Sequence, residues 1–232
     1  MIVGDDLMLG AGESSRDVSV SHVASLSQLK VLSSRHPRPI TEEPVFIASP
    51  RGDRTPAAVE AMLLRRSFYP RSVGLGELID AADGPATPEA VRAHLGASLL
   101  HLACGVTAGG ALLLAESTEL DLSGTTVPAA GLAILPPDHF LPLADILLTA
   151  GYTGVIGWRR PVLAPIATVA SFILHRELVD VGGTPAQAVR QTRRWLRNPD
   201  PGLLPPLLTG YCDNLAAADR EDSACQLIYR GR

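Results

Sequence analysis

Short runs of apolar residues alternate with longer amphipathic segments over most of the chain. The apolar runs predict buried strands at 45–48, 98–103, 111–115, 132–135 and 154–158. The segments between them predict helices at 56–66, 88–95, 140–149, 165–179 and 185–196. Strands that are apolar throughout and separated by helices are typical of a parallel sheet covered on both faces. The pattern therefore predicts an α/β fold.

The two ends of the chain carry a weaker pattern. Residues 1–44 show little periodicity apart from an alternation over 18–23 that predicts a short strand, so they are interpreted as a partly irregular N-terminal segment. Residues 45–232 are interpreted as one domain, because a single core commonly serves about 100–250 residues. Within it, the Pro- and Gly-rich stretch 198–223 predicts a surface excursion, and 225–229 predicts a final edge strand.

Composition and charge narrow the classes of function. The chain is 46% hydrophobic and 19% charged with a net charge of −4, and its acids and bases are interspersed. Such a chain has material for a sizeable core but no basic stripe, so we expect no nucleic-acid partner. The longest apolar run, 161–174, is shorter than the roughly 18–20 residues of a membrane span, so we expect no membrane association. Three widely spaced cysteines and an N-terminus unlike a signal peptide favour a cytoplasmic protein.

The common catalytic and cofactor motifs are missing from the sequence. There is no Gly-x-Ser-x-Gly elbow, no phosphate-binding Walker loop and no His-Glu-x-x-His helix. The fragment 74–76 lacks the third glycine of a dinucleotide site. The cysteine spacings do not fit a metal site either. We therefore expect neither a cofactor nor a metal ion.

The segment from Leu99 to Val106 is the most informative part of the sequence. It reads Leu-Leu-His-Leu-Ala-Cys-Gly-Val and resembles the histidine motif of the CHAT family, bacterial relatives of caspases and separases. The similarity covers 17–232 and continues, in order, through 45–50, 60–70, 87–91, 150–158 and 182–190. It is of the actinobacterial type and implies a caspase-like three-layer α/β/α sandwich with a mostly parallel central sheet. Residues 1–44 would then be a shortened start of the family domain.

The resemblance also implies that the protease residues have been lost. Family members carry a second histidine, the catalytic base, after the cysteine of this motif, and Gly105 stands there in this chain. The strand that delivers the family's nucleophilic cysteine ends here at Asp138. We therefore expect a catalytically inactive module, a pseudoprotease, that binds a protein or peptide in a regulatory role.

Two other interpretations remain open at this point. A cysteine endopeptidase with a rearranged dyad would use Cys104 with His101 or His139, because a thiol needs a base within hydrogen-bond reach. The apolar surroundings of Cys104 and His101 favour structural roles for both, whereas His139 lies beside the vacated nucleophile position. The other interpretation is a decayed fragment with no function of its own.

The segment after 154–158 carries the candidate binding residues. Family members often have an aspartate after the tryptophan that corresponds to Trp158, in the segment that forms the substrate pocket, whereas this chain continues with Arg159 and Arg160. Two guanidinium groups reverse the local charge and favour carboxylates. We therefore expect Trp158, Arg159 and Arg160 to bind a partner that is acidic.

Overall fold

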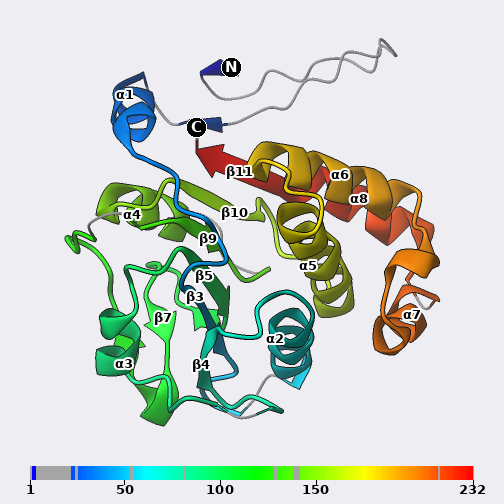
Figure 1. The fold of residues 1–232 in the computed structure, drawn as a ribbon, viewed down its shortest axis with the longest axis horizontal. Helices are drawn as coiled ribbons and strands as arrows, with labels where there is room; N and C mark the ends of the chain where they lie inside the picture. The colour runs from blue at the N-terminus through cyan, green and yellow to red at the C-terminus, as the bar shows by residue number, and fades with distance from the viewer. Residues whose placement is uncertain are drawn as a thin grey trace.

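The fold is known from a computed structural model of the chain. It describes residues 2–3, 22–23, 26–52, 55–80, 82–127, 130–137, 142–213 and 215–231. These residues form a mixed α/β fold in which a mostly parallel sheet lies between two layers of helices (Figure 1). The predicted fold class, a three-layer α/β/α arrangement, is confirmed.

The central sheet has the strand order β1-β2-β11-β10-β9-β5-β3-β4. Its strands are β1 (Ile2–Val3), β2 (His22–Val23), β3 (Pro44–Ala48), β4 (Val73–Gly76), β5 (Leu99–Ala103), β9 (Leu132–Ile134), β10 (Gly154–Trp158) and β11 (Leu227–Gly231). Only the pair of β10 with β11 is antiparallel among the described strand pairs of this sheet. The carboxyl ends of β3, β5, β9 and β10 therefore lie along one edge of the sheet.

The helices cover the two faces of the sheet unequally. One face carries α2 (Thr55–Phe68), α5 (Ala164–Val179), α6 (Pro185–Arg197), α7 (Pro206–Asp213) and α8 (Ala217–Gln226). The other carries α1 (Leu26–Ser34), α3 (Pro88–Ala93) and α4 (Leu143–Ala150). Side chains of a strand alternate between faces, so Leu100 and Leu102 of β5 enter the core under α4, whereas Leu99 and Ala103 enter the core under α5.

Local sequence explains where two of the predicted helices begin. The side chain of Thr87 accepts a hydrogen bond from the Ala90 N–H at the start of α3, which has Pro88 at its first position. At the start of α6, Thr184 and Gln187 form a capping box, in which each side chain bonds the backbone of the other residue. The helix predicted at 185–196 is thus confirmed, with its start fixed by this cap.

The segment after β5 departs from the prediction. The expected parallel strand at 111–115 is instead β7 (Leu112–Leu113), which forms a separate antiparallel sheet with β6 (Gly105–Val106) and β8 (Glu119–Leu120). A 3₁₀ turn, Ala115–Ser117, follows β7. A parallel strand needs a long crossover, but only a short turn containing Gly110, with φ of 89°, connects β6 to β7.

The two ends of the chain also differ from the expectation. The stretch 198–223 contains a 3₁₀ turn, Pro201–Leu203, and most of the helices α7 and α8, which its Pro, Gly and polar residues concealed. The expected edge strand at 225–229 is β11, which pairs with β10 on one side and β2 on the other. Of the strand expected at 18–23, His22–Val23 forms β2, while 18–21 lie outside the described residues.

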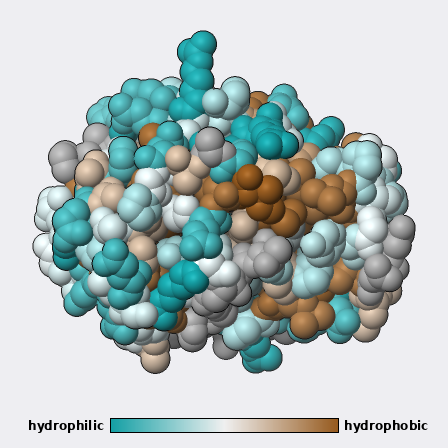
Figure 2. All heavy atoms as spheres, turned by 90° about the horizontal axis from the view of Figure 1, so that it is seen from below, coloured by the Kyte–Doolittle hydropathy of each residue, from teal (hydrophilic) through white to brown (hydrophobic). Residues whose placement is uncertain are grey.

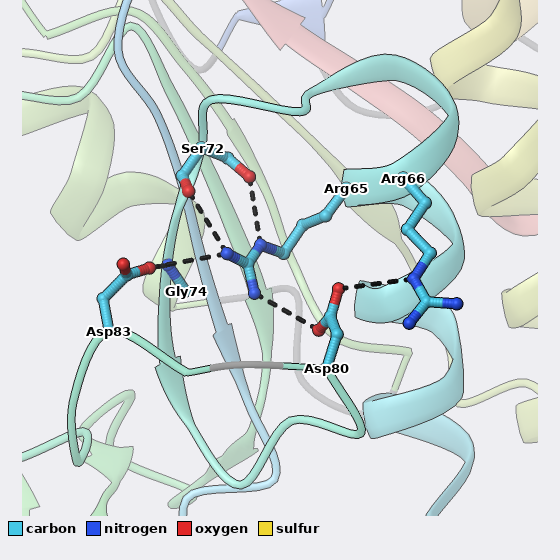
Figure 3. Close-up of polar contacts among 6 residues, drawn as sticks. All are labelled: Arg65, Arg66, Ser72, Gly74, Asp80 and Asp83. Carbon is cyan, nitrogen blue, oxygen red and sulfur yellow. Dashed lines mark hydrogen bonds and ion pairs between the residues drawn. The ribbon is translucent and has the colours of Figure 1, made fainter.

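Helix α2 is held against β4 and the loop after it by Arg65 (Figure 3). Its guanidinium donates hydrogen bonds to the hydroxyl and the carbonyl oxygen of Ser72, at 3.1 and 3.3 Å, and pairs with Asp80 at 3.3 Å and Asp83 at 3.4 Å. Asp83 also accepts a hydrogen bond of 2.6 Å from the backbone N–H of Gly74. One side chain therefore connects three segments, and it fixes the helix that contributes Glu60 to the candidate site.

Candidate functional site

A pocket opens at the carboxyl edge of the sheet, between α2 and α5. Its volume is about 190 Å³, and it is lined by Pro56, Ala57, Glu60, Leu102, Ala103, Leu135, Pro136, Pro137, Trp158, Ala164, Ala167, Thr168 and Ser171. Figure 2 views the molecule from below Figure 1, the side toward which β3 runs, and hydrophobic residues gather in a patch on that face. Most of the lining is apolar, with one carboxylate among the described lining residues.

Trp158 lines this pocket, and the two arginines that follow it are exposed. After the two arginines, the N–H of Val162 donates a hydrogen bond of 3.2 Å to the carbonyl oxygen of Pro137. Pro137 is also a lining residue, so the chain lies next to the pocket again at Val162. Neither Arg159 nor Arg160 forms an ion pair with any described carboxylate. Two solvent-exposed guanidinium groups therefore follow a lining residue of the pocket directly in the chain.

Arg159 also belongs to a wider positive region beside α6. Its backbone N–H donates to the carbonyl oxygen of Gln226 at 2.9 Å, at the end of α8. The pKa of Arg193 is lowered to about 10, first by burial and then by the charges of Arg197 and Arg159. Charges that lower the pKa of a neighbouring arginine lie close to it, so the surface around Arg159 favours anions.

Glu60 is the one acidic residue among the described lining residues, and it is held by two donors. Nε2 of His101, on β5, lies 3.0 Å from Oε1 of Glu60, and the hydroxyl of Thr168, on α5, donates to Oε2 at 3.2 Å. The Glu60 side chain is 12% exposed and that of His101 is 2% exposed. The carboxylate is therefore fixed in orientation at the pocket wall and is largely shielded from solvent.

A line of hydrogen bonds continues from His101 into the core. Nδ1 of His101 lies 3.2 Å from Nε2 of His175, on α5, and Nδ1 of His175 lies 2.8 Å from the hydroxyl oxygen of Tyr69. Both histidines and Tyr69 are buried, and the ring of Phe46 packs against all three of them. Burial holds the pKa of His175 well below its ordinary value, and a proton on His101 would lower it further.

The donors and acceptors along this line of hydrogen bonds determine which nitrogen of each histidine carries a proton. A carboxylate only accepts, so Nε2–H of His101 donates to Glu60. If His101 were a cation, its Nδ1–H would donate to His175, and Nδ1–H of His175 would then donate to Tyr69. The Tyr69 hydroxyl hydrogen would be left with no acceptor among the described residues, which is costly in a buried site. With both imidazoles neutral, Tyr69 donates to His175, His175 to His101 and His101 to Glu60, and every group is satisfied.

The structure separates Cys104 from His101, one of the two histidines considered for a rearranged dyad. Cys104 is fully buried directly after β5 and packs in the core under α4, which agrees with the structural role that its apolar surroundings favour. The ring nitrogens of His101 reach Glu60 and His175 on the opposite face of the sheet. Cys104 and His101 are therefore not brought together. Gly105, at the family's histidine position, opens β6, and Asp138 and His139 lie outside the described residues.

Sequence reasoning did not identify Glu60, Tyr69, Thr168 or His175 as members of the site. A signal for two of them was present in α5. Thr168, Ser171 and His175 follow one another at spacings of three and four residues in a mostly apolar helix, and such positions share one helix face. A polar stripe on a buried helix indicates a polar partner across the interface, because buried polar groups are hydrogen-bonded.

Other kinds of site find no support in the part of the chain that the structure describes. No group of three or more His, Cys, Asp or Glu residues in it could hold a metal ion. None of its helices is both long and apolar enough to cross a membrane. Neither a protein-family model nor a curated protein matches the chain. The resemblance to the CHAT family thus stays a prediction from the sequence.

Proposed function

We propose that the chain is a catalytically inactive, caspase-like module of the CHAT type that binds an acidic protein or peptide in a regulatory role. One observation carries this proposal: Trp158 lines the pocket at the carboxyl edge of the sheet, and the exposed Arg159 and Arg160 that follow it form no ion pair with a described carboxylate. Ligands of open α/β sheets bind at this edge, and guanidinium groups favour carboxylates.

The lining of the pocket supports a role in binding rather than proteolysis. The described lining residues include no cysteine and no histidine, whereas a cysteine protease needs a thiolate beside a base. Gly105, at the family's histidine position, has no side chain to act as a base. Cys104 is buried on the other face of the sheet.

The size of the pocket indicates what part of a partner enters it. Sites for drug-sized ligands have volumes of about 300–1,000 Å³, and this pocket is smaller, at about 190 Å³. The pocket therefore fits one side chain of a peptide. Carboxylates on the neighbouring residues of the peptide would then pair with Arg159 and Arg160. Trp158 contributes a large, rigid contact surface of the kind that is enriched at binding hot spots.

The test is a binding measurement on the full chain with a charge-reversed variant. Fluorescence anisotropy would follow a labelled peptide of alternating glutamate and leucine, with a lysine and leucine peptide for comparison. We expect the acidic peptide to bind and its affinity to fall at least tenfold in the Arg159→Glu, Arg160→Glu variant. Raising the salt concentration should also weaken binding, because exposed charges are screened.

The matched control reverses two exposed arginines elsewhere. Arg71 and Arg92 are exposed and lie away from the pocket lining, so the Arg71→Glu, Arg92→Glu variant changes the net charge equally and should retain binding. Equal loss in both variants would indicate a general charge effect. That outcome, or no binding of the acidic peptide by the unmodified chain, would refute the proposal.

A further inference from the structure

We infer that the pocket binds an alkylammonium group, such as the amine of a lysine side chain, with Glu60 as its counter-ion. The inference rests on the proposed function in one respect, namely that the lysine belongs to the bound peptide. The partner would then present a lysine flanked by carboxylates.

The first argument is the uncompensated charge of Glu60. The carboxylate is 12% exposed, and the line of hydrogen bonds that begins at Tyr69 is satisfied only with both imidazoles neutral. His101 and Thr168 therefore supply hydrogen bonds to Glu60 but no positive charge. No other described cationic side chain lies within ion-pair distance of it. A mostly buried carboxylate is stabilised by a nearby cation. A cationic ligand can reach Glu60 through the pocket.

The second argument is the number of acceptors at the pocket wall. An ammonium group has three N–H donors. Glu60 keeps acceptor capacity beyond its two hydrogen bonds, and the hydroxyl oxygen of Thr168, which donates to Glu60, can itself accept. Ser171 lines the same pocket and is 9% exposed, and its hydroxyl makes no hydrogen bond to any described residue. Glu60, Thr168 and Ser171 together match one ammonium group.

The third argument is the apolar remainder of the lining. A lysine stem is a chain of four methylene groups that packs along apolar surface while its charged end finds polar partners. Alanine and proline side chains, with Leu135, supply such a surface in this pocket. Trp158 lines it too, and an indole face is the best aromatic partner for a cation.

The geometry favours an ammonium over a guanidinium group. A guanidinium binds a carboxylate best through two parallel hydrogen bonds to its two oxygens. Both oxygens of Glu60 already accept a hydrogen bond, from His101 and from Thr168. A compact point charge needs only one remaining acceptor site on the carboxylate, so lysine should bind more tightly than arginine.

The experiment measures the affinity of the pocket for single amino-acid derivatives, so it can be done before any peptide partner is known. Calorimetry on the full chain would compare Nα-acetyl-lysine amide with Nα-acetyl-norleucine amide, which has a similar stem without the charge, and with Nα-acetyl-arginine amide. We expect the lysine compound to bind at least tenfold more tightly than the norleucine compound. The Glu60→Gln variant, which keeps an acceptor for His101, should lose at least tenfold in affinity for lysine. Glu89→Gln, which changes an exposed carboxylate on α3, should lose none.

The possible outcomes separate this inference from the proposed function. Equal affinity for the lysine and norleucine compounds would overturn the inference without any variant having to fold. Binding of lysine that is unchanged in Glu60→Gln would overturn it as well. If acidic peptides bind equally with lysine or norleucine at the centre, the proposed function stands and the inference fails. If the lysine compound binds through Glu60 but no acidic peptide does, the inference stands and the proposed function fails.

Discussion

Nε2 of His175 lies 3.2 Å from Nδ1 of His101, so helix α5 and strand β5 share a hydrogen bond inside an otherwise apolar layer. At its two ends this pair reaches Glu60 within α2 and Tyr69, the residue after α2 ends. The same α2 packs against α5. Polar groups in a core are costly unless every partner is present, so this line of hydrogen bonds specifies how α2, α5 and β5 fit together.

Removal of the Tyr69 hydroxyl should destabilise the protein measurably. In Tyr69→Phe the ring still fills its site, but the buried Nδ1 of His175 loses its donor. An unsatisfied buried acceptor costs about 1–3 kcal/mol, so the free energy of unfolding in urea should fall by that amount. Tyr211→Phe is the control, because the half-buried Tyr211 hydroxyl makes no hydrogen bond to a described residue. A loss that is equal in the two variants would contradict the proposed arrangement.

His175 should make stability depend on pH. Burial lowers the pKa of His175 well below its ordinary value of 6.5, so below pH 6.5 the unfolded chain binds a proton that the folded chain does not. The contribution is complete above pH 6.5 and is lost as the pH falls toward the lowered pKa. Between pH 7.5 and 5.5 this histidine alone should remove about 1.4 kcal/mol from the free energy of unfolding.

Urea unfolding at the two pH values would measure this loss. The His175→Gln variant should lack it, whereas His36→Ala, which changes an exposed histidine, should retain it. Equal pH dependence of His175→Gln and the unmodified chain would show that His175 does not carry the effect.

Local pattern predicted the fold better than it predicted the site. The strand at 154–158 and the capped helix at Pro185 follow from periodicity and helix-start residues, and these are short-range properties. The pairing of Glu60 with His101 joins residues 41 positions apart, and that of His101 with His175 joins residues 74 positions apart. Such contacts depend on the order of strands in the sheet, which periodicity does not contain. Helix α8 was missed because its polar sequence, Ala217–Gln226, has few apolar positions to indicate a buried face.

Arg65 should not be replaceable by lysine. Its planar group reaches Ser72, Asp80 and Asp83 at once, whereas an ammonium group cannot span these partners. We expect Arg65→Lys to lower the free energy of unfolding by about 1–3 kcal/mol and to speed proteolytic cleavage within residues 77–86. Arg66→Lys is the control, because the Arg66 side chain is 65% exposed and reaches Asp80 only at 3.8 Å. Exposed pairs contribute about 0–1 kcal/mol, so similar losses in both variants would refute the special role of Arg65.

Native cysteine chemistry should be confined to Cys225. Cys104 and Cys212 are buried, whereas Cys225 is exposed, so iodoacetamide should modify Cys225 alone in the folded protein and all three cysteines in urea. Mass spectrometry after digestion would locate the modified thiols, and a Cys225→Ser variant should label only on unfolding. An electrophilic peptide probe should behave in the same way, because a thiol buried in apolar surroundings is a poor nucleophile. Rapid labelling of Cys104 in the native Cys225→Ser variant would contradict the inactive module and favour a cysteine peptidase.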